Sequence, residues 1–322
     1  MKALVLHELH APLRFESVPD PAQGDDIQIV KLQAASLNHR DLWITKGLYP
    51  GIILPTILGS CGCGMIGDRQ VVINPNIDWG DEPKVQSAAF HILGLKTKGT
   101  FAEQIAIPTD RIHDAPVHFS AEESATLPLS GLTAYRATMV KAKIEKTDKV
   151  LISGIGGGVA LFAAQFALAT GAEVWATSSS ISKLVMATKL GIVGTANYKD
   201  ADWSKGLAAK AGLFDVIIDS AAGDGFNDLV KLAAPAARIV IYGGGAGKIN
   251  QLNPQAIFWK QLNIMGSTMG NDEEFSEMLS FVNQHKIKPV IDEVFPLKEG
   301  NAALQKMQEA SQFGKIVLRI EG

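Results

Sequence analysis

The sequence predicts a two-domain α/β protein, in which one domain has a parallel sheet with helices on both faces and the other is rich in β-strands. The chain has 322 residues, which is more than one hydrophobic core usually serves. Its first third consists of short β-like runs and turns, whereas its middle alternates apolar runs with helical segments. Near-continuous apolar strands separated by helices are typical of a parallel sheet buried on both faces.

The first third is expected to form an antiparallel, partly irregular β domain. Turn-forming segments such as Tyr49-Pro50-Gly51 and Asn74-Pro75-Asn76 separate short runs of strand character. The expected strands cover residues 2–6, 27–32, 71–74 and 101–107.

The middle of the chain is expected to form the parallel sheet. Its predicted strands cover residues 149–153, 173–177, 215–219, 238–242 and 263–266. Helical segments lie between them, for example at 158–170 and 182–190.

The last part of the chain has a different pattern. It reads as an amphipathic helix at 272–285, an extended run at 289–295, a helix at 300–310 and a last strand at 315–320. The β-rich domain is therefore expected to take back the C-terminus and to be discontinuous. Residues 1–124 and 269–322 are predicted to form that domain, and residues 125–268 the parallel-sheet domain.

Composition and charge exclude several classes of protein. With 47% hydrophobic and 20% charged residues, the chain can bury sizeable cores and is not disordered. A net charge of −3 lacks the basic excess that is typical of nucleic-acid-binding proteins. His7 and Glu8 interrupt the N-terminus before a signal peptide can form, and the apolar stretch 159–169 is too short to span a bilayer. We expect a cytoplasmic protein with a small-molecule substrate and without nucleic-acid or membrane partners.

A glycine-rich segment follows the predicted strand 149–153 and opens a helix. It reads Gly154-Ile155-Gly156-Gly157-Gly158-Val159-Ala160. Glycines let the backbone turn sharply and approach a diphosphate, and the helix N-terminus offers unpaired N–H groups and a positive dipole end. One register places Val159 at the third glycine position; the other, Gly157-x-x-Ala160, places a small residue there and is preferred.

This context predicts a Rossmann dinucleotide-binding domain, because a second strand ends about 20 residues after the loop. A glycine-rich turn without a ligand is the alternative. The loop residues expected at the cofactor phosphates are Gly156, Gly157, Gly158 and Val159.

The end of the second strand indicates which dinucleotide binds. An NAD site places Asp or Glu there for the ribose hydroxyls, but this chain reads Thr177-Ser178-Ser179-Ser180-Ile181-Ser182-Lys183. Hydroxyl donors and an ammonium group favour the 2′-phosphate of NADP(H), which a carboxylate would repel. Ser178, Ser179 and Lys183 are the predicted phosphate ligands; the alternative is that a serine caps the next helix and Lys183 is solvated.

Several motifs lie in one order along the chain: Asn38-His39-Arg40-Asp41, Lys46 to Pro50, Leu127 to Tyr135, the glycine loop and Phe313 to Val317. Together they resemble the medium-chain dehydrogenase/reductase superfamily, in particular its zinc-less quinone oxidoreductase-like, alcohol dehydrogenase-like branch. The resemblance implies a GroES-like catalytic domain formed by both chain ends, a Rossmann domain between them, and a cleft for the nicotinamide. It also implies a homodimer that pairs the last Rossmann strand, here near 263–267.

Zinc-dependent members of this superfamily use Cys, His and Cys as catalytic ligands. The resemblance places Asn38, Ser60 and about Leu129 at those positions, which is not a zinc-binding set, and the four-cysteine structural lobe is absent. Cys61 and Cys63 are the only cysteines. We expect them to be small buried thiols rather than metal ligands, although His39 or His91 could complete a site with them. No metal is expected.

Without a metal, the resemblance implies that side chains near the missing ligands polarise the substrate. Asn38 would donate an amide hydrogen bond to a substrate carbonyl, or it is a turn residue. Asp41 would lie near the cleft, or would cap a short helix at 42–46. Tyr49 would bind substrate or shuttle a proton, or it is an aromatic plug beside Pro50.

The resemblance also implies further cofactor contacts along both domains. They are His39 at the diphosphate, Thr133 at the nicotinamide end, Tyr198 beside the 2′-phosphate, Ser267 at the carboxamide and Lys315 at phosphate or ribose, with Ser220, Tyr242 and Gly243 at the intervening strand ends. Two departures from the pattern are a shortened hairpin at 67–70 and Ala236-Ala237 where a Gly-Gly turn is usual. An alanine with positive φ would be strained there.

The function expected from these features is zinc-independent hydride transfer from NADPH to a quinone, an enone or another activated carbonyl compound. Two alternatives remain open. One is a zinc-dependent alcohol dehydrogenase with atypical ligands such as Cys61 or Cys63. The other is a non-catalytic NADPH-binding protein.

Overall fold

The computed structural model describes residues 1–321, which divide into two compact units. One unit comprises Met1–Leu132 together with the chain from Gly270 onward, and the other comprises Thr133–Met269. The first unit therefore contains both chain ends. The chain passes from the first unit to the second after Leu132, within the helix Pro128–Tyr135, whereas the sequence predicts this boundary after residue 124.

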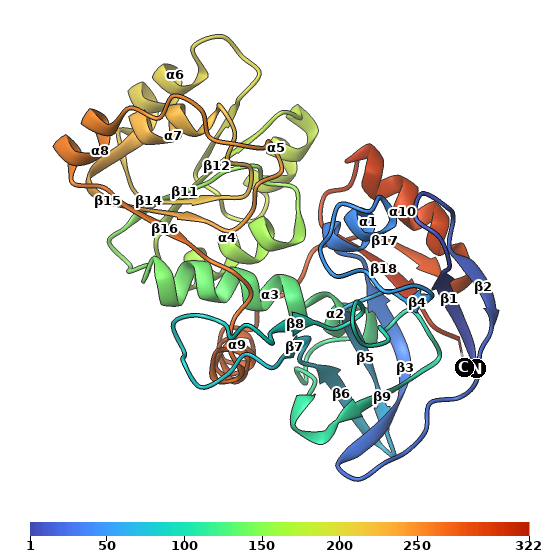
Figure 1. The fold of residues 1–322 in the computed structure, drawn as a ribbon. Helices are drawn as coiled ribbons and strands as arrows, with labels where there is room; N and C mark the ends of the chain where they lie inside the picture. Colours follow the sequence, from blue (N-terminus) through green and yellow to red (C-terminus); the bar gives the residue numbers. More distant parts are fainter. Residues whose placement is uncertain (322) are drawn as a thin grey trace. The chain divides into compact units, whose positions relative to one another are not determined.

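The second unit is built on a six-stranded parallel sheet (Figure 1). Its strand order is β13-β12-β11-β14-β15-β16. The strands are β11 (Lys149–Ile152), β12 (Glu173–Ser178), β13 (Gly194–Asn197), β14 (Phe214–Asp219), β15 (Ala233–Ile241) and β16 (Asn263–Gly266). This sheet confirms the predicted α/β fold.

Helices cover both faces of this sheet. Figure 1 shows α6, α7 and α8 on one side of it and α4 on the other. The central strands are apolar on both faces: Val150 and Leu151 of β11 are fully buried, as are Val216 and Ile217 of β14. The helices are α4 (Gly158–Thr170), α5 (Ile181–Thr188), α6 (Trp203–Ala211), α7 (Phe226–Leu232) and α8 (Pro254–Lys260). A π-helical segment (Arg136–Lys141) continues α3 (Pro128–Tyr135) into this unit.

The first unit is rich in β-strands. Its largest sheet has the order β10-β6-β5-β3-β18-β17, with β9 also paired to β3. The members are β3 (Ile27–Ser36), β5 (Cys61–Ile66), β6 (Arg69–Ile73), β9 (Gln104–Pro108), β10 (Ile112–Asp114), β17 (Ile291–Pro296) and β18 (Lys315–Arg319). The last strand, β18, runs antiparallel to β3 with Val317 opposite Ser36, so the C-terminus does return to the β-rich unit.

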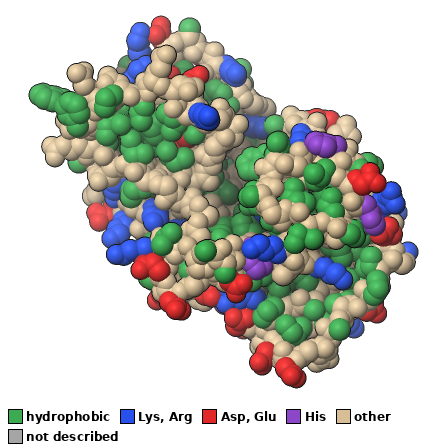
Figure 2. All heavy atoms as spheres, viewed as in Figure 1, with side chains coloured by type: hydrophobic (Ala, Val, Ile, Leu, Met, Phe, Trp, Pro, Cys, Tyr) green, Lys and Arg blue, Asp and Glu red, His purple; other side chains and the backbone are tan. Residues whose placement is uncertain are grey.

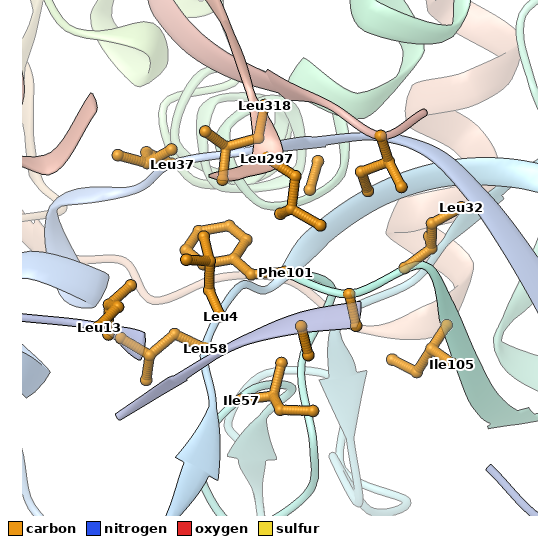
Figure 3. Close-up of a cluster of buried hydrophobic side chains, with 14 of the residues drawn as sticks. Leu4, Leu13, Leu32, Leu37, Ile57, Leu58, Phe101, Ile105, Leu297 and Leu318 are labelled. Atoms are coloured by element: carbon orange, nitrogen blue, oxygen red, sulfur yellow. The ribbon is translucent and has the colours of Figure 1, made fainter. Parts of the chain in front are cut away.

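Smaller elements complete the first unit. The small strands are β1 (Lys2–Leu6), β2 (Arg14–Ser17), β4 (Thr56–Ile57), β7 (Asn76–Ile77) and β8 (His91–Ile92). The helices are α1 (His39–Thr45), α2 (Ala121–Thr126), α9 (Asp272–His285) and α10 (Gly300–Glu309), with single 3₁₀ turns at Thr109–Arg111 and Leu297–Glu299. Figure 3 shows the core that these elements enclose, in which Leu4 and Phe101 pack with Leu318 of the last strand.

Three local predictions are corrected or extended by the structure. The short helix is α1 at His39–Thr45 rather than at 42–46, because Asn38 is its N-cap. Strand β3 continues to Ser36, well beyond residue 32. Ala236 has φ of 62°, so the position where a glycine was expected does require the left-handed conformation.

Among residues 1–321, no helix combines the length and the apolar character that a bilayer span requires.

Candidate active site

Most of the predicted cofactor residues lie along one edge of the parallel sheet. Parallel strands end at the same edge, and ligands of open α/β sheets bind outside those carboxyl ends. Ser178 ends β12, Ser220 follows β14, Tyr242 follows β15 and Ser267 follows β16. The fold therefore brings these side chains to the edge from which the glycine loop also emerges.

The glycine loop is anchored to the end of the neighbouring strand. Gly154 has φ of 72° and its N–H donates to Thr177 Oγ1 at 3.2 Å, while Ile155 N–H donates to the Thr177 carbonyl at 2.7 Å. Gly157 is the N-cap of α4, and a Cβ placed there would meet no atom within 4 Å. Ala160 is buried whereas Val159 is not, as the preferred register requires. The helix N-terminus thus faces open space of the kind that a diphosphate fills.

The sequence leaves open whether the serines at the end of β12 bind phosphate or cap the next helix. Ser180 is the N-cap of α5 and its hydroxyl accepts from Lys183 N–H. Ser178 is buried and its Oγ accepts from Ser180 N–H at 3.2 Å, whereas Ser179 is exposed. Capping therefore falls to Ser180.

Lys183 extends from α5 toward the glycine loop. A Cβ placed on Gly156 would lie 3.0 Å from Lys183 Cδ and 3.5 Å from its Nζ. Tyr198 N–H donates to the Ser178 carbonyl at 3.1 Å, and 41% of this tyrosine is exposed. Ser178 thus ends β12 and Ser179 follows it, Tyr198 is bonded to Ser178 through its backbone, and Lys183 reaches from the next helix to the glycine loop.

Two further strand ends are held by internal hydrogen bonds. The Asp219 carboxylate accepts from Ser153 Oγ and from the N–H of Ala222 at 2.8 Å, which closes the loop after β14. Burial raises the pKa of the Tyr242 phenol, although its hydrogen bond with Ser220 opposes this, so the phenol stays protonated. A Cβ on Gly243 would lie 2.6 Å from the Ser220 carbonyl oxygen, a backbone approach that only glycine allows.

Ser267 and Thr133 also lie in this unit. Ser267 N–H donates to the Ile241 carbonyl at 2.9 Å. Within the described part of the chain, the buried Ser267 Oγ has no hydrogen-bond partner. Thr133 Oγ1 lies 3.8 Å from the sulfur of Met269. The Ser267 hydroxyl is therefore available to a ligand.

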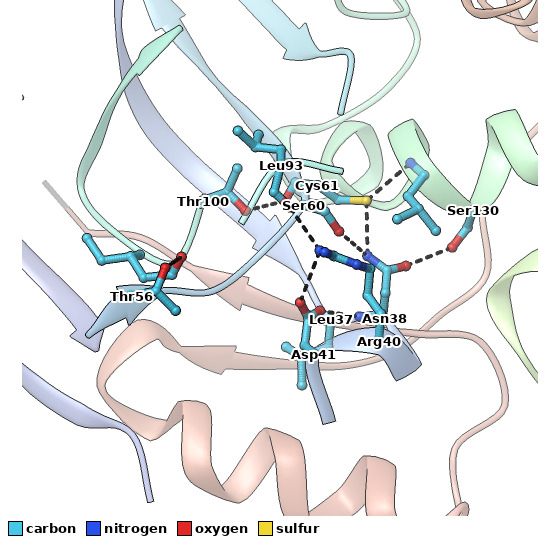
Figure 4. A network of polar contacts seen from close by, with 12 residues as sticks. Leu37, Asn38, Arg40, Asp41, Thr56, Ser60, Cys61, Leu93, Thr100 and Ser130 are labelled. Atoms are coloured by element: carbon cyan, nitrogen blue, oxygen red, sulfur yellow. Dashed lines mark hydrogen bonds and ion pairs between the residues drawn. The ribbon is translucent and has the colours of Figure 1, made fainter. Parts of the chain in front are cut away.

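A second polar cluster lies in the β-rich unit and is centred on Asn38 (Figure 4). Lys315 Nζ donates to Asn38 Oδ1 at 2.7 Å, to the Leu37 carbonyl at 2.6 Å and to Ser130 Oγ at 3.1 Å. Ser130 Oγ in turn donates to Asn38 Oδ1 at 3.2 Å. Only 6% of Asn38 and 4% of Lys315 are exposed, so this is an interior network.

The amide nitrogen of Asn38 faces the other side of the cluster. It donates to Ser60 Oγ at 3.3 Å and to Cys61 Sγ at 3.2 Å. The N–H of Leu129, near the start of α3, also donates to Cys61 Sγ at 3.2 Å. Asn38 therefore uses both ends of its amide within the protein.

Charged side chains are packed beside this network. Asp41 Oδ2 accepts from Asn38 N–H at 2.8 Å, so Asp41 is the third helical residue of α1 and reaches back to its N-cap. Burial raises the pKa of the Asp41 carboxyl, against the opposing charges of Arg40 and Lys315. Burial likewise lowers the pKa of the Lys315 ammonium, while Cys61 and Asp41 oppose that shift. Each shift reflects the cost of a charge in a dry interior.

Tyr49 packs against Arg40 at the margin of this cluster. The Arg40 guanidinium lies 5.0 Å from the centre of the Tyr49 ring and donates to the Leu93 carbonyl at 2.8 Å. Its Nη1 lies 4.0 Å from Asp41 Oδ1. This contact agrees with the packing role for Tyr49, which also borders the hydrophobic core.

The cluster does not fit a zinc ion. The three positions that the resemblance assigns to zinc ligands offer an amide, a hydroxyl and an aliphatic side chain, and zinc requires three or four thiolate, imidazole or carboxylate ligands. Between residues 1 and 321, no group of three or more His, Cys, Asp or Glu side chains is placed to hold a metal. Both Cys61 and Cys63 are buried free thiols. A buried ammonium group, that of Lys315, already lies within this cluster.

The predicted residues thus fall into two groups. Asn38, Asp41 and Lys315 meet in the β-rich unit, and Lys315 lies with the catalytic candidates rather than along the sheet edge. His39 is exposed at the start of α1, with its ring centre 6.4 Å from that of Trp43. Sequence reasoning did not identify Ser60, Ser130 and Arg40 as members of the cluster. The sequence offers one indication for two of them: Ser60 stands at a position that the resemblance assigns to a zinc ligand, and Ser130 follows another such position, Leu129.

Comparison with known proteins agrees with this architecture. A family model described as zinc-binding dehydrogenase matches residues 158–284. A zinc-type alcohol dehydrogenase-like protein of Leptosphaeria maculans is 31% identical, over 97% of this chain and 96% of its own. One from Schizosaccharomyces pombe is 35% identical, over 96% of this chain and 95% of its own.

Solved structures give the same result. A crystal structure of an NAD-dependent alcohol dehydrogenase is 33% identical with a TM-score of 0.93, and each chain is covered completely. The quinone oxidoreductase from Thermus thermophilus, solved also in complex with NADPH, is 26% identical with a TM-score of 0.84, covering 99% of this chain and 100% of its own. A nicotinamide cofactor is accordingly expected. The chain belongs to the medium-chain, zinc-binding dehydrogenase superfamily and is an oxidoreductase of that superfamily.

Proposed function

We propose that this oxidoreductase is a zinc-independent reductase of the quinone oxidoreductase-like branch, which uses NADPH to reduce an enone, a quinone or another activated carbonyl compound. The observation that carries the proposal is the polar surface at the end of β12. There Lys183 extends over Gly156, Ser178 ends the strand and Ser179 follows it, and residues 177–183 include no carboxylate.

Charge and hydrogen bonding at this position favour the phosphorylated cofactor. A hydrogen bond to a charged group contributes about 1.5–3 kcal/mol, and about 1.4 kcal/mol corresponds to one factor of ten in affinity. One bond from Lys183 or Ser179 to the 2′-phosphate would thus favour NADPH over NADH by about tenfold or more. The solved complex of the related quinone oxidoreductase with NADPH is consistent with this choice.

Hydride donation is the chemistry that NADPH supplies when bound. Asn38 supports the reaction by donating from Nδ2 toward the oxygen that gains negative charge on the acceptor. Its present acceptors are Ser60 Oγ at 3.3 Å and Cys61 Sγ at 3.2 Å. An oxyanion can compete with them because it accepts a stronger, charge-assisted hydrogen bond than a hydroxyl does. In the second unit, Gly157 at the start of α4 would hold the diphosphate and Ser267 Oγ would hold the carboxamide.

Two other functions are distinguished by experiment. Alcohol dehydrogenase names predominate among the relatives, but the donor set at Asn38, Ser60 and Leu129 does not suit a zinc-dependent alcohol dehydrogenase. A non-catalytic NADPH-binding protein would retain the sheet-edge residues and show no turnover.

The test measures activity with each combination of cofactor and acceptor, on protein that has been dialysed against a chelator. NADPH or NADH oxidation is followed at 340 nm with enones, quinones and aldehydes, and NAD⁺ or NADP⁺ reduction with alcohols. We expect NADPH oxidation with at least one enone or quinone, unchanged by added zinc. Alcohol oxidation that depends on added zinc would support the metal-dependent alternative, and binding of NADPH without any turnover would support the non-catalytic one.

We also propose that the protein forms a homodimer through β16, which is the edge strand of its sheet. An edge strand offers unpaired backbone groups to a second copy. Phe258 and Trp259 of the adjacent α8 are 62% and 84% exposed, and Figure 2 shows hydrophobic side chains gathered in that region. Light scattering on the purified protein should give the dimer mass, and Trp259→Lys should shift it toward the monomer.

A further inference from the structure

The ammonium group of Lys315 is a buried cation whose hydrogen bonds are fully used. An ammonium group has three donors and no acceptor. Its three partners are the Leu37 carbonyl at 2.6 Å, Asn38 Oδ1 at 2.7 Å and Ser130 Oγ at 3.1 Å. All three partners are oxygen atoms, so the positive charge is fully solvated by the protein.

The fold fixes where this lysine begins. Gly314 has φ of 120°, and a Cβ on it would lie 2.4 Å from the Val290 carbonyl oxygen. Lys315 N–H donates to that same oxygen at 2.9 Å. The glycine therefore lets β18 start close to Val290, with Lys315 as its first residue.

The lysine determines which end of the Asn38 amide faces which partner. Since an ammonium group cannot accept a hydrogen bond, only Oδ1 of Asn38 can face Lys315, and the Ser130 hydroxyl adds a second donor to the same oxygen. The amide nitrogen must then face Ser60 and Cys61. Without the cation, nothing in this contact would distinguish the two orientations of the amide.

The cation also polarises the amide. Two donors on Oδ1 draw electron density toward the carbonyl oxygen, which makes the N–H groups on the same amide stronger donors. The neighbouring charges are Asp41, whose pKa is raised by burial, and Arg40, which lies 4.0 Å from Asp41. Arg40 and Lys315 bring two basic side chains to this buried region against the one acidic side chain of Asp41, and this balance favours a developing oxyanion.

We propose that Lys315 is the positioning residue of this site: it orients and polarises Asn38, and thereby supplies the electrostatic stabilisation that a zinc ion supplies in zinc-dependent dehydrogenases. This inference rests on the proposed reductase function, since it identifies the group on which the role of Asn38 depends. All three N–H groups of Lys315 are used inside its own unit. The Kd for NADPH distinguishes this positioning role from the cofactor contact that the sequence predicts for the same residue.

The test compares Lys315→Met with Lys260→Met. Lys260 is a matched control because its Nζ also donates to three carbonyl oxygens, those of Val230 (3.1 Å), Lys231 (2.9 Å) and Ala233 (2.7 Å), at a place remote in sequence from the cluster. We expect Lys315→Met to lower kcat by on the order of 100-fold, with KM and the Kd for NADPH close to wild type. Lys260→Met should reduce thermal stability and leave kcat unchanged.

A spectroscopic readout keeps the inference testable independently of turnover. In ¹⁵N-labelled protein, the side-chain amide pair of Asn38 is identified by its loss in Asn38→Asp. We expect this pair to shift in Lys315→Met and to remain in place in Lys260→Met. If Lys315→Met fails to fold, Lys315→Gln, which keeps two donors without the charge, is expected to show the same loss of kcat and the same shift.

Three results would overturn the inference. They are an unchanged kcat in a folded Lys315 variant, a weakened NADPH Kd as its only defect, or an Asn38 amide pair that does not respond. An inactive wild-type protein would refute the proposed function alone, because the amide spectrum would still report whether Lys315 orients Asn38.

Discussion

The side chain of Lys183 lies over Gly156, so that a Cβ on the glycine would stand 3.0 Å from Lys183 Cδ. One residue belongs to α5 and the other to the loop before α4, and the contact joins the end of β12 to the glycine loop. An ammonium group in this position suits a ligand that has one phosphate group at the end of β12 and a diphosphate at the glycine loop. The first prediction follows from this contact.

Lys183→Ala is expected to weaken NADPH binding by about tenfold or more and to change NADH binding much less, because one charge-assisted hydrogen bond to the 2′-phosphate is lost. Titration calorimetry with both cofactors measures the two affinities. Lys189→Ala, an exposed lysine at the end of the same helix, is the control and should leave both unchanged. An equal loss for the two cofactors would assign Lys183 to the diphosphate instead.

Asp41→Asn is expected to change how stability depends on pH. Burial raises the folded-state pKa of Asp41, so the folded protein holds this proton more tightly than the unfolded chain does. The resulting stabilisation is present at low pH and is lost as pH rises through the folded-state pKa. The asparagine keeps an acceptor for Asn38 N–H but does not titrate.

Urea unfolding at a series of pH values checks this sign. The stability of Asp41→Asn relative to wild type should increase as pH rises from below the ordinary carboxyl range toward neutrality. A relative stability that falls with pH would mean that Arg40 and Lys315 outweigh desolvation at this carboxyl.

The Cys63 thiol is expected to be unreactive in the native protein. Burial raises its pKa to about 12, with the neighbouring Ser124 side chain in partial opposition, and the thiolate is the reactive form. In a Cys61→Ser variant, where Cys63 is the remaining cysteine, iodoacetamide at pH 8 should label the protein only after denaturation. Rapid labelling of the folded variant would contradict the assigned burial.

Ala236→Gly is expected to stabilise the protein by about 0.5–1 kcal/mol. Ala236 is exposed and has φ of 62°, a conformation that costs an L-residue about 1–2 kcal/mol, and glycine offsets part of this gain through its greater freedom when unfolded. The urea midpoint measures the change. The control is Ala234→Gly in the same strand, which has no such strain to relieve and should lower the stability of the protein. If both variants lower the stability, Ala236 is not strained.

The sequence predicts those elements best whose local pattern reflects burial. The apolar strand Asn263–Gly266 and helix α4 have the predicted bounds, and α4 ends before Gly171, whose φ is 89°. Strand β13 (Gly194–Asn197) was missed because this edge strand is short, half-buried and lacks an apolar run. Strand β15 was predicted to start five residues late, because Pro235 and the alanines before Arg238 carry no strand signal.

The candidate site was predictable only where its parts are local. Asn38 and Asp41 are three residues apart, and both lie at the N-terminus of α1, so the start of this one helix brings them together. Asn38 and Lys315 are 277 residues apart, and they meet because β18 pairs with β3. No local pattern encodes that pairing, so the sequence predicts neither the contact of Lys315 with Asn38 nor the place of Ser130 beside them.

The most direct test of the whole account compares the affinities of the wild-type protein for NADPH and NADH by calorimetry. The account predicts tighter binding of NADPH, by about tenfold or more, because serine hydroxyls and the Lys183 ammonium replace the carboxylate of an NAD site. Equal or tighter binding of NADH, or no binding of either cofactor, would contradict it.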